Sequence, residues 1–160
     1  MGYSSRVRIS NLRMILNSMN SLISTFDGSS DRIFEKDFSA EAESVDGDVQ
    51  ILFDEFTGPF KLVSCKILGK FYSMRPLWRQ NAEFIHCTFV GNVSFSAAQW
   101  KEDLTFKHCK FESKFVIEDS WVTGKTTFEH CNFVKGTNSF GDRQGASIGV
   151  VDFEGGLYIL

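Results

Sequence analysis

The sequence predicts an all-β solenoid of about four coils, with 22 residues in each coil. Four cysteines follow one another at this interval, at Cys65, Cys87, Cys109 and Cys131. Three of the four stand in the same local phrase, with a Phe three residues before the Cys, a His directly before it and a Phe two residues after it. Copies of the apolar pattern without Cys lie halfway between them, 11 residues along. A fixed period of this length indicates one supersecondary unit stacked on itself.

The large apolar residues show how each coil is built. They recur in alternating steps of five and six residues, and thirteen of fourteen such positions are apolar, Ser73 being the exception. Neither a helix, with about 3.6 residues per turn, nor a long alternating strand has this spacing. The steps predict short extended pieces of about three residues, each followed by a turn, and four such pieces return the chain to its starting direction. The positions are 62, 67, 73, 78, 84, 89, 95, 100, 106, 111, 117, 122, 128 and 133.

Residues one coil apart are expected to stack at the spacing of neighbouring strands, about 4.8 Å. Alternation within each short strand places the Cys inside the coil and the His before it outside. Because a small side chain is wanted beside the stacked Phe rings, we interpret the cysteines as structural thiols and not as disulfides. The expected inward columns are Cys65, Cys87, Cys109 and Cys131; Ile67, Phe89, Phe111 and Phe133; Leu62, Phe84, Phe106 and Phe128; Ile51, Ser73, Phe95 and Ile117; and Phe56, Trp78, Trp100 and Val122.

This pattern resembles the pentapeptide-repeat family, whose unit has a large central Leu or Phe and a small residue two positions before it. The resemblance covers roughly residues 45–133, and the sequence departs from the family pattern because every second unit has six residues. It implies a right-handed quadrilateral β-helix. The central residues here are Phe89, Trp100, Phe111, Val122 and Phe133, and the small ones are Cys87, Ala98, Cys109, Ser120 and Cys131.

The N-terminal segment, residues 1–44, is expected to hold a cap for the solenoid of residues 45–133. Residues 10–26 have one apolar stripe and predict an amphipathic α-helix, with Ser10 as its N-cap. A β-helix exposes an apolar core and unpaired backbone at each end, and both have to be covered. We therefore expect the helix to cap the N-terminal end, and docking on a partner chain is the alternative.

The C-terminal segment, residues 134–160, begins with a break in the repeat. Residues 135–147 are rich in Gly, Asn and Ser and predict a loop. The motif then restarts out of phase, and the chain finishes on three apolar residues and a Tyr. We expect these residues to form a final strand on the open end, or half of a homodimer interface. The family resemblance also implies a homodimer through this end.

The three histidines, His86, His108 and His130, directly precede cysteines and suggest a metal site at first sight. Because His points outward and Cys inward, a mixed site is disfavoured, and three donors in a line enclose a tetrahedral ion poorly. We therefore expect no metal and no cofactor. We expect a binding face instead, formed by Lys110 and the three histidines. Trp121 is predicted to point outward on the column of Leu77 and is a candidate hot spot.

Charge and composition exclude several classes of function. The net charge is −3, but residues 27–55 hold ten acidic residues against two basic ones, and no basic stripe follows. Direct nucleic-acid binding is therefore not expected. No apolar run is long enough to span a membrane, and the N-terminus lacks a signal-peptide pattern, so a cytoplasmic protein is expected. Phosphate-binding loops, nucleophile elbows and convincing carboxylate pairs are absent, so no enzyme and no catalytic residue are predicted.

The sequence therefore predicts a non-enzymatic protein–protein interaction module, because repeat solenoids present rigid, extended faces to partner proteins. The identity of the partner is not predicted. The family resemblance implies an alternative, since some members resemble duplex DNA in shape and charge and protect or inhibit type II topoisomerases. Here the coils interleave lysines with acidic residues, whereas such a mimic is expected to be strongly acidic.

Overall fold

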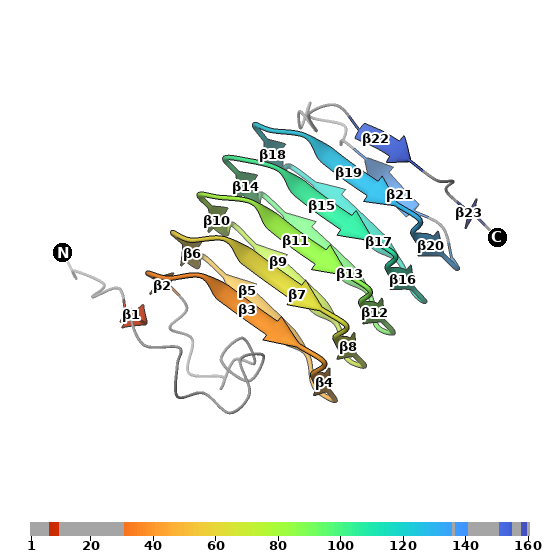
Figure 1. The fold of residues 1–160 in the computed structure, drawn as a ribbon, viewed down its shortest axis with the longest axis horizontal. Coiled ribbons are helices and arrows are strands. Elements are labelled where there is room, and N and C mark those ends of the chain that lie inside the picture. Colours follow the sequence, from red (N-terminus) through yellow and green to blue (C-terminus); the bar gives the residue numbers. More distant parts are fainter. Residues whose placement is uncertain (1–6, 10–30, 136, 141–150, 155–157, 160) are drawn as a thin grey trace.

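The computed structural model describes residues 7–9, 31–135, 137–140, 151–154 and 158–159 (Figure 1). These residues form 23 β-strands and no helix. The expected helix over residues 10–26 lies outside the described residues. The strands stack as an all-β parallel solenoid of about five coils with four sheets, which confirms the fold class predicted from the sequence.

We name the four sheets A to D, in the order in which each coil passes through them. Sheet A contains β1 (Val7–Ile9), β2 (Arg32–Phe34), β6 (Glu55–Phe56), β10 (Leu77–Trp78), β14 (Gln99–Trp100) and β18 (Trp121–Val122). Sheet B contains β3 (Phe38–Glu41), β7 (Phe60–Val63), β11 (Ala82–Ile85), β15 (Leu104–Lys107), β19 (Thr126–Glu129) and β22 (Val151–Glu154). Sheet C contains β4 (Ser44–Val45), β8 (Lys66–Ile67), β12 (Thr88–Phe89), β16 (Lys110–Phe111), β20 (Asn132–Phe133) and β23 (Tyr158–Ile159). Sheet D contains β5 (Val49–Leu52), β9 (Phe71–Met74), β13 (Val93–Ser96), β17 (Phe115–Glu118) and β21 (Thr137–Phe140).

The coils have two wide sides and two narrow ones. Strands β3 to β19 of sheet B and β5 to β17 of sheet D have four residues, of which two point inward. Strands β6 to β18 of sheet A and β4 to β20 of sheet C have two residues, of which one points inward. The six-residue units of the sequence supply the wide strands, and the five-residue units supply the narrow ones. This is why a large side chain such as Phe71, Leu104 or Phe115 is accommodated two positions before the centre of a long unit.

The inward columns are those expected from the period. Strand pairing joins residues 22 apart in all four sheets, for example Phe84 with Phe106 and Trp78 with Trp100. Stacked rings follow from this register, with centroids 4.6 Å apart for Phe84 and Phe106 and 5.0 Å apart for Trp78 and Trp100. Burial of these rings removes the largest apolar surfaces from water and is the main source of stability.

The stacking begins earlier than the phase visible in the sequence. Strands β2, β3 and β4 pair in register with β6, β7 and β8, so a coil precedes residue 45. The sequence signal fades there because Ala40 stands where later coils have a large residue. The large aromatic residue of β3 is Phe38 instead, and its ring stacks on that of Phe60 with centroids 4.9 Å apart.

Beyond Phe133 the solenoid continues with altered spacing. Strand β21 pairs with β17 through a register shift and lies inside the segment expected to be a loop, so that expectation is wrong for residues 137–140. Strand β22 pairs with β19, and β23 pairs with β20. Paired residues of β19 and β22, such as Phe128 and Phe153, are 25 positions apart instead of 22, so the motif is out of phase although the backbones still pair.

Candidate binding surface

Two corners of every coil have the same unusual backbone. The residue after each strand of sheet B from β3 to β19, and after each strand of sheet D from β5 to β17, has a positive φ of 49–56°. From Ala42 to His108, each of these corner residues donates its backbone N–H to a carbonyl oxygen of the next coil. His86 donates to Lys107 in this way, and Arg75 donates to Ser96. The B-to-C corner holds Ala42, Ser64, His86, His108 and His130, and the D-to-A corner holds Phe53, Arg75, Ala97 and Asp119.

The histidines occupy the B-to-C corner as one exposed stack. Their ring centroids lie 4.8 Å apart for His86 and His108 and 4.9 Å apart for His108 and His130. His, like Asn and Asp, is enriched among non-glycine residues with positive φ. The turn geometry and ring stacking therefore account for this column without a ligand.

Charged groups border the histidine stack. Lys107 Nζ lies 2.8 Å from Glu129 Oε2, and this hydrogen bond holds the pKa of Glu129 below its ordinary value, with smaller contributions from the charges of Lys107, His130 and His108. Lys110 is exposed on β16 and pairs with Glu112 at 2.7 Å. Among the described residues, His, Cys, Asp and Glu form no group of three or more that could hold a metal ion.

The cysteines form a buried column behind the histidine corner. All four are free thiols with at most 2 % of their surface exposed. Each thiol donates to the carbonyl oxygen of a residue 25 positions earlier, as Cys109 does to Phe84 at 3.2 Å. Burial raises the pKa of the Cys109 thiol, and hydrogen bonds with the thiols of Cys131 and Cys87 raise it further. Thiols buried in this way pack as small groups beside the Phe columns.

Trp121 lies on a different side of the solenoid from the histidines and Lys110. It belongs to sheet A, whereas Lys110 belongs to sheet C, and each coil passes through a wide sheet between the two. Trp121 is 54 % exposed, as expected, and it follows Leu77 and Gln99 in one outward column. The structure therefore places Trp121 on the column of Leu77, as predicted, and away from the face that holds Lys110 and the histidines.

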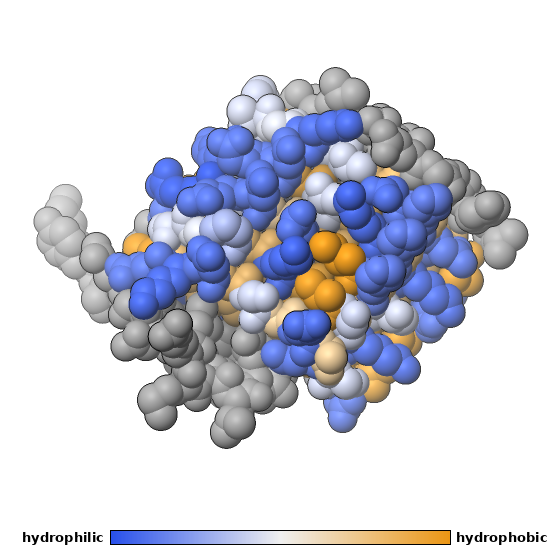
Figure 2. All heavy atoms as spheres, in the orientation of Figure 1, coloured by the Kyte–Doolittle hydropathy of each residue, from blue (hydrophilic) through white to orange (hydrophobic). Residues whose placement is uncertain are grey.

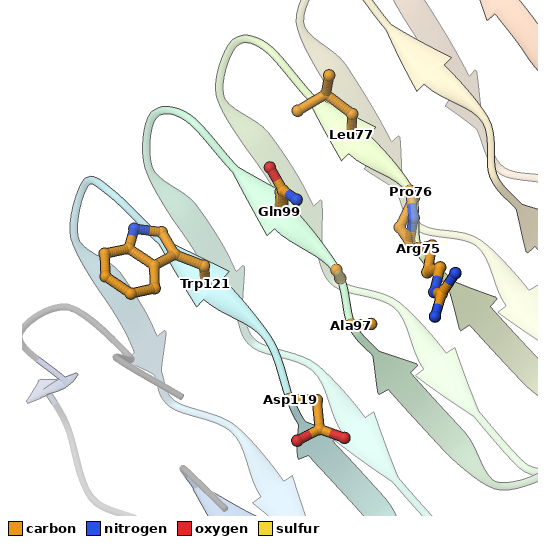
Figure 3. Close-up of a pocket in the computed structure, with 8 residues that line it drawn as sticks. Arg75, Pro76, Leu77, Ala97, Gln99, Asp119 and Trp121 are labelled. Atoms are coloured by element: carbon orange, nitrogen blue, oxygen red, sulfur yellow. The ribbon is translucent and has the colours of Figure 1, made fainter. Parts of the chain in front are cut away.

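Trp121 borders a pocket of about 420 Å³ at the D-to-A corner. Figure 3 shows Leu77, Gln99 and Trp121 in one row on successive strands, with Arg75, Ala97 and Asp119 in a second row beside it. Ala97 is the smallest member of its column, and it lies between a cationic and an anionic neighbour. The remaining lining residues, Pro76 and Ala98, are buried. We call this surface the Trp121 pocket.

Sequence reasoning missed Arg75, Ala97 and Asp119, although a signal for them existed. They stand 11 residues before His86, His108 and His130, so the half-period makes the two corners equivalent. Tracing that equivalence would have identified both rows of outward corner residues. It would not have identified the hollow, which depends on the side chains surrounding Ala97.

The two wide faces differ in charge. On sheet B, five of the ten outward residues of β3, β7, β11, β15 and β19 are charged, and ion pairs join Lys61 with Glu83 and Lys107 with Glu129. Figure 2 shows this face as mostly hydrophilic, with a small hydrophobic patch near its middle. On sheet D, only Glu118 is charged among the eight outward residues of β5, β9, β13 and β17.

Exposed apolar side chains gather around sheet D. Tyr72 points outward from the sheet, Phe53 lies at its corner with sheet A, and Leu68 lies at its corner with sheet C. The guanidinium of Arg75 lies 5.9 Å from the centroid of the Phe53 ring. Together with Trp121, these are the exposed large apolar residues of the part of the chain that the structure describes with side chains. Sheet D is therefore the less charged of the two wide faces, and the Trp121 pocket lies at its edge.

No family model, curated protein or solved structure matches the chain. No helix with the length and apolar character of a membrane span occurs among the residues that the structure describes.

Proposed function

We propose that this protein is a non-enzymatic protein–protein interaction module that binds its partner through sheet D and the Trp121 pocket. The observation that carries the proposal is an exposed Trp beside a pocket, next to a wide face with a single charged residue. Tryptophan is enriched among the residues that contribute most to binding at protein interfaces. A weakly charged face is also less costly to remove from water than a charged one.

The rigidity of the solenoid supports this function. Four parallel sheets hold the pocket residues at the ends of hydrogen-bonded strands, and the corner backbone at Arg75 and Ala97 is hydrogen-bonded to the next coil. A surface ordered before binding loses little conformational entropy when a partner docks. The histidine stack and Lys110 offer a second surface on the other side, where the partner would have to replace existing ion pairs such as Lys110 with Glu112.

DNA mimicry is the alternative, and it rests on the resemblance to pentapeptide repeats and on the acidic first coil. Glu41, Asp46 and Asp48 are exposed there. Later coils interleave opposite charges, as in the pairs Lys61 with Glu83 and Lys107 with Glu129, which weakens the field that a mimic needs. A DNA gyrase supercoiling assay tests this alternative, and activity unchanged at high protein concentration would rule it out.

Affinity capture from the native cell tests the interaction proposal. Two variants change the Trp121 pocket: Trp121→Ala removes the exposed ring, and Ala97→Asn fills the hollow with a residue that tolerates the φ of 49° at that corner. We expect both to lose the partner recovered with the wild-type protein, by at least about tenfold, the loss that corresponds to about 1.4 kcal/mol at an interface hot spot. His108→Asn on the opposite side is the matched control and should retain it. Equal recovery by all four proteins would contradict the proposal.

A further inference from the structure

The residues of the Trp121 pocket are arranged in two columns that are complementary to their own reversed copies. One column reads Arg75, Ala97 and Asp119, and the other reads Leu77, Gln99 and Trp121. The first has a cation at one end, an anion at the other and a small residue between them. The second has an apolar side chain at each end and an amide between them.

A two-fold axis relates such columns without conflict. We place the two-fold axis at the level of Ala97 and Gln99, in the plane of contact between two protomers and perpendicular to the solenoid axis. Each column then faces the same column of the second protomer, which runs in the opposite direction. Arg75 of one protomer then faces Asp119 of the other, and both such pairs form, because a two-fold contact repeats every interaction. Successive coils are about 4.8 Å apart, so these pairs lie about 10 Å apart along the solenoid, on either side of the axis.

The second column is equally well matched by this operation. Trp121 of one protomer faces Leu77 of the other, beside the hollow that Ala97 leaves, so the exposed ring has an apolar surface to cover it. Gln99 faces its own copy, and an amide can both donate to and accept from a second amide.

We propose that a second copy of this chain binds at the Trp121 pocket, in an antiparallel two-fold dimer held by Arg75–Asp119 and Leu77–Trp121 pairs. The inference rests on the proposed function, since it names the partner of the same surface. It also differs from the homodimer expected through the C-terminal end, because the contact is lateral and centred on the coil of Ala97.

On the opposite wide face, sheet B, an axis midway between β7 and β11 would bring Lys61 opposite Glu83 of the copy, but these two side chains already pair within one protomer. The same operation centred on β11 places Glu83 opposite its own copy, and centred on β15 it places Lys107 opposite its own copy. Like charges brought together at an interface oppose association. A contact through sheet B would have to replace existing ion pairs or bring like charges together, whereas the D-to-A corner offers an exposed Trp beside a pocket, so we place the dimer contact at that corner.

Charge reversal tests the arrangement by sedimentation velocity of the full chain over a concentration series. We expect the wild-type protein to dimerise, and Arg75→Glu and Asp119→Arg each to weaken the dimer by at least about tenfold, because each variant places two like-charge pairs in its own dimer. Mixing the two variants should restore dimerisation, since the introduced glutamate then faces the introduced arginine in one pair and native Arg75 faces native Asp119 in the other. Far-ultraviolet circular dichroism of each variant checks that it is folded.

The control is Lys107→Glu on sheet B, which should leave the dimer intact. A wild-type monomer at every concentration would overturn the inference, as would a dimer insensitive to both reversals or variants that remain monomeric when mixed. A monomer that still captures a different protein, and loses it on Trp121→Ala, would overturn only the dimer and leave the proposed function standing.

Discussion

Each coil consists of two halves that share a backbone and differ in their side chains. In one half, the corner column contains three histidines and the inward column behind it contains four cysteines. In the other half, the equivalent corner holds Phe53, Arg75, Ala97 and Asp119, and the column behind it holds Asp54, Pro76, Ala98 and Ser120. Both corners nevertheless keep a φ close to 50°.

The difference shows that stacking requires compatible neighbours and not identical ones. Identical side chains satisfy it through ring stacks and a repeated thiol-to-carbonyl hydrogen bond, as at His108 and Cys109. We call the other half, whose corner and inward columns hold different residues, the varied half. Its residues form individual hydrogen bonds, such as those of Ser120, whose hydroxyl donates to the carbonyl of Glu118 and accepts from the N–H of Ala98. Variation leaves room for a hollow, an exposed ring and opposite charges, and these features make the varied half the better candidate for binding.

The strongest test of the varied half is its buried ion pair. Asp54 is fully buried in the small-residue column, and Arg32 Nη2 and Nε lie 2.6 and 3.0 Å from its carboxylate oxygens. Arg32→Ala should lower the free energy of unfolding in urea by about 3–5 kcal/mol, because it leaves a buried carboxylate without its cation. The double variant Arg32→Ala, Asp54→Ala should recover much of the loss, since Ala98 shows that Ala fits this column. Equal destabilisation by the single and double variants would contradict this account.

The second test concerns the C-to-D corner, where Gly47, Gly69 and Gly91 stack and Ser113 follows in the next coil. A Cβ at Gly91 would overlap the carbonyl oxygen of Gly69, which is backbone and cannot move aside easily. Gly91→Ala should therefore cost about 3 kcal/mol of unfolding free energy, the upper end of the range for overpacking. Gly47→Ala is a matched control, because a Cβ there meets no atom within 4 Å. Urea denaturation curves that coincide for the two variants would show that the close approach does not constrain the coil.

The smallest expected effect comes from substitutions in the buried Cys column, which is equivalent to the column that holds Ser120. Cys109→Ser should be tolerated with a loss below about 1 kcal/mol, because Ser120 already serves the equivalent position with a hydroxyl. Cys109→Leu should cost about 1–2 kcal/mol by overpacking a fully surrounded site. Thermal denaturation of both variants measures the difference. A serine variant less stable than the leucine variant would mean that the thiol contributes more than its small size.

The interior could be predicted almost completely from the sequence. Alternation and the 22-residue period place Phe84, Phe106 and Phe128 in one column, and strand pairing confirms it. The first coil could not be delimited, because Ala40 interrupts the apolar phase while Phe38 supplies the aromatic from a neighbouring position. The strand at residues 137–140 was missed because Gly, Asn and Ser around it are typical of loops, although backbone hydrogen bonds can form with any non-proline sequence.

The sequence by itself determined which residues lie inside. Side chains alternate between inward and outward within each short strand, and this alternation repeats in every coil. Only the tertiary structure decided which outward residues meet. It showed that Trp121 and Ala97 line one pocket. The reason is that outward contacts depend on how the chain turns at each corner and on the size of the side chains one coil away, and neither is encoded in the period.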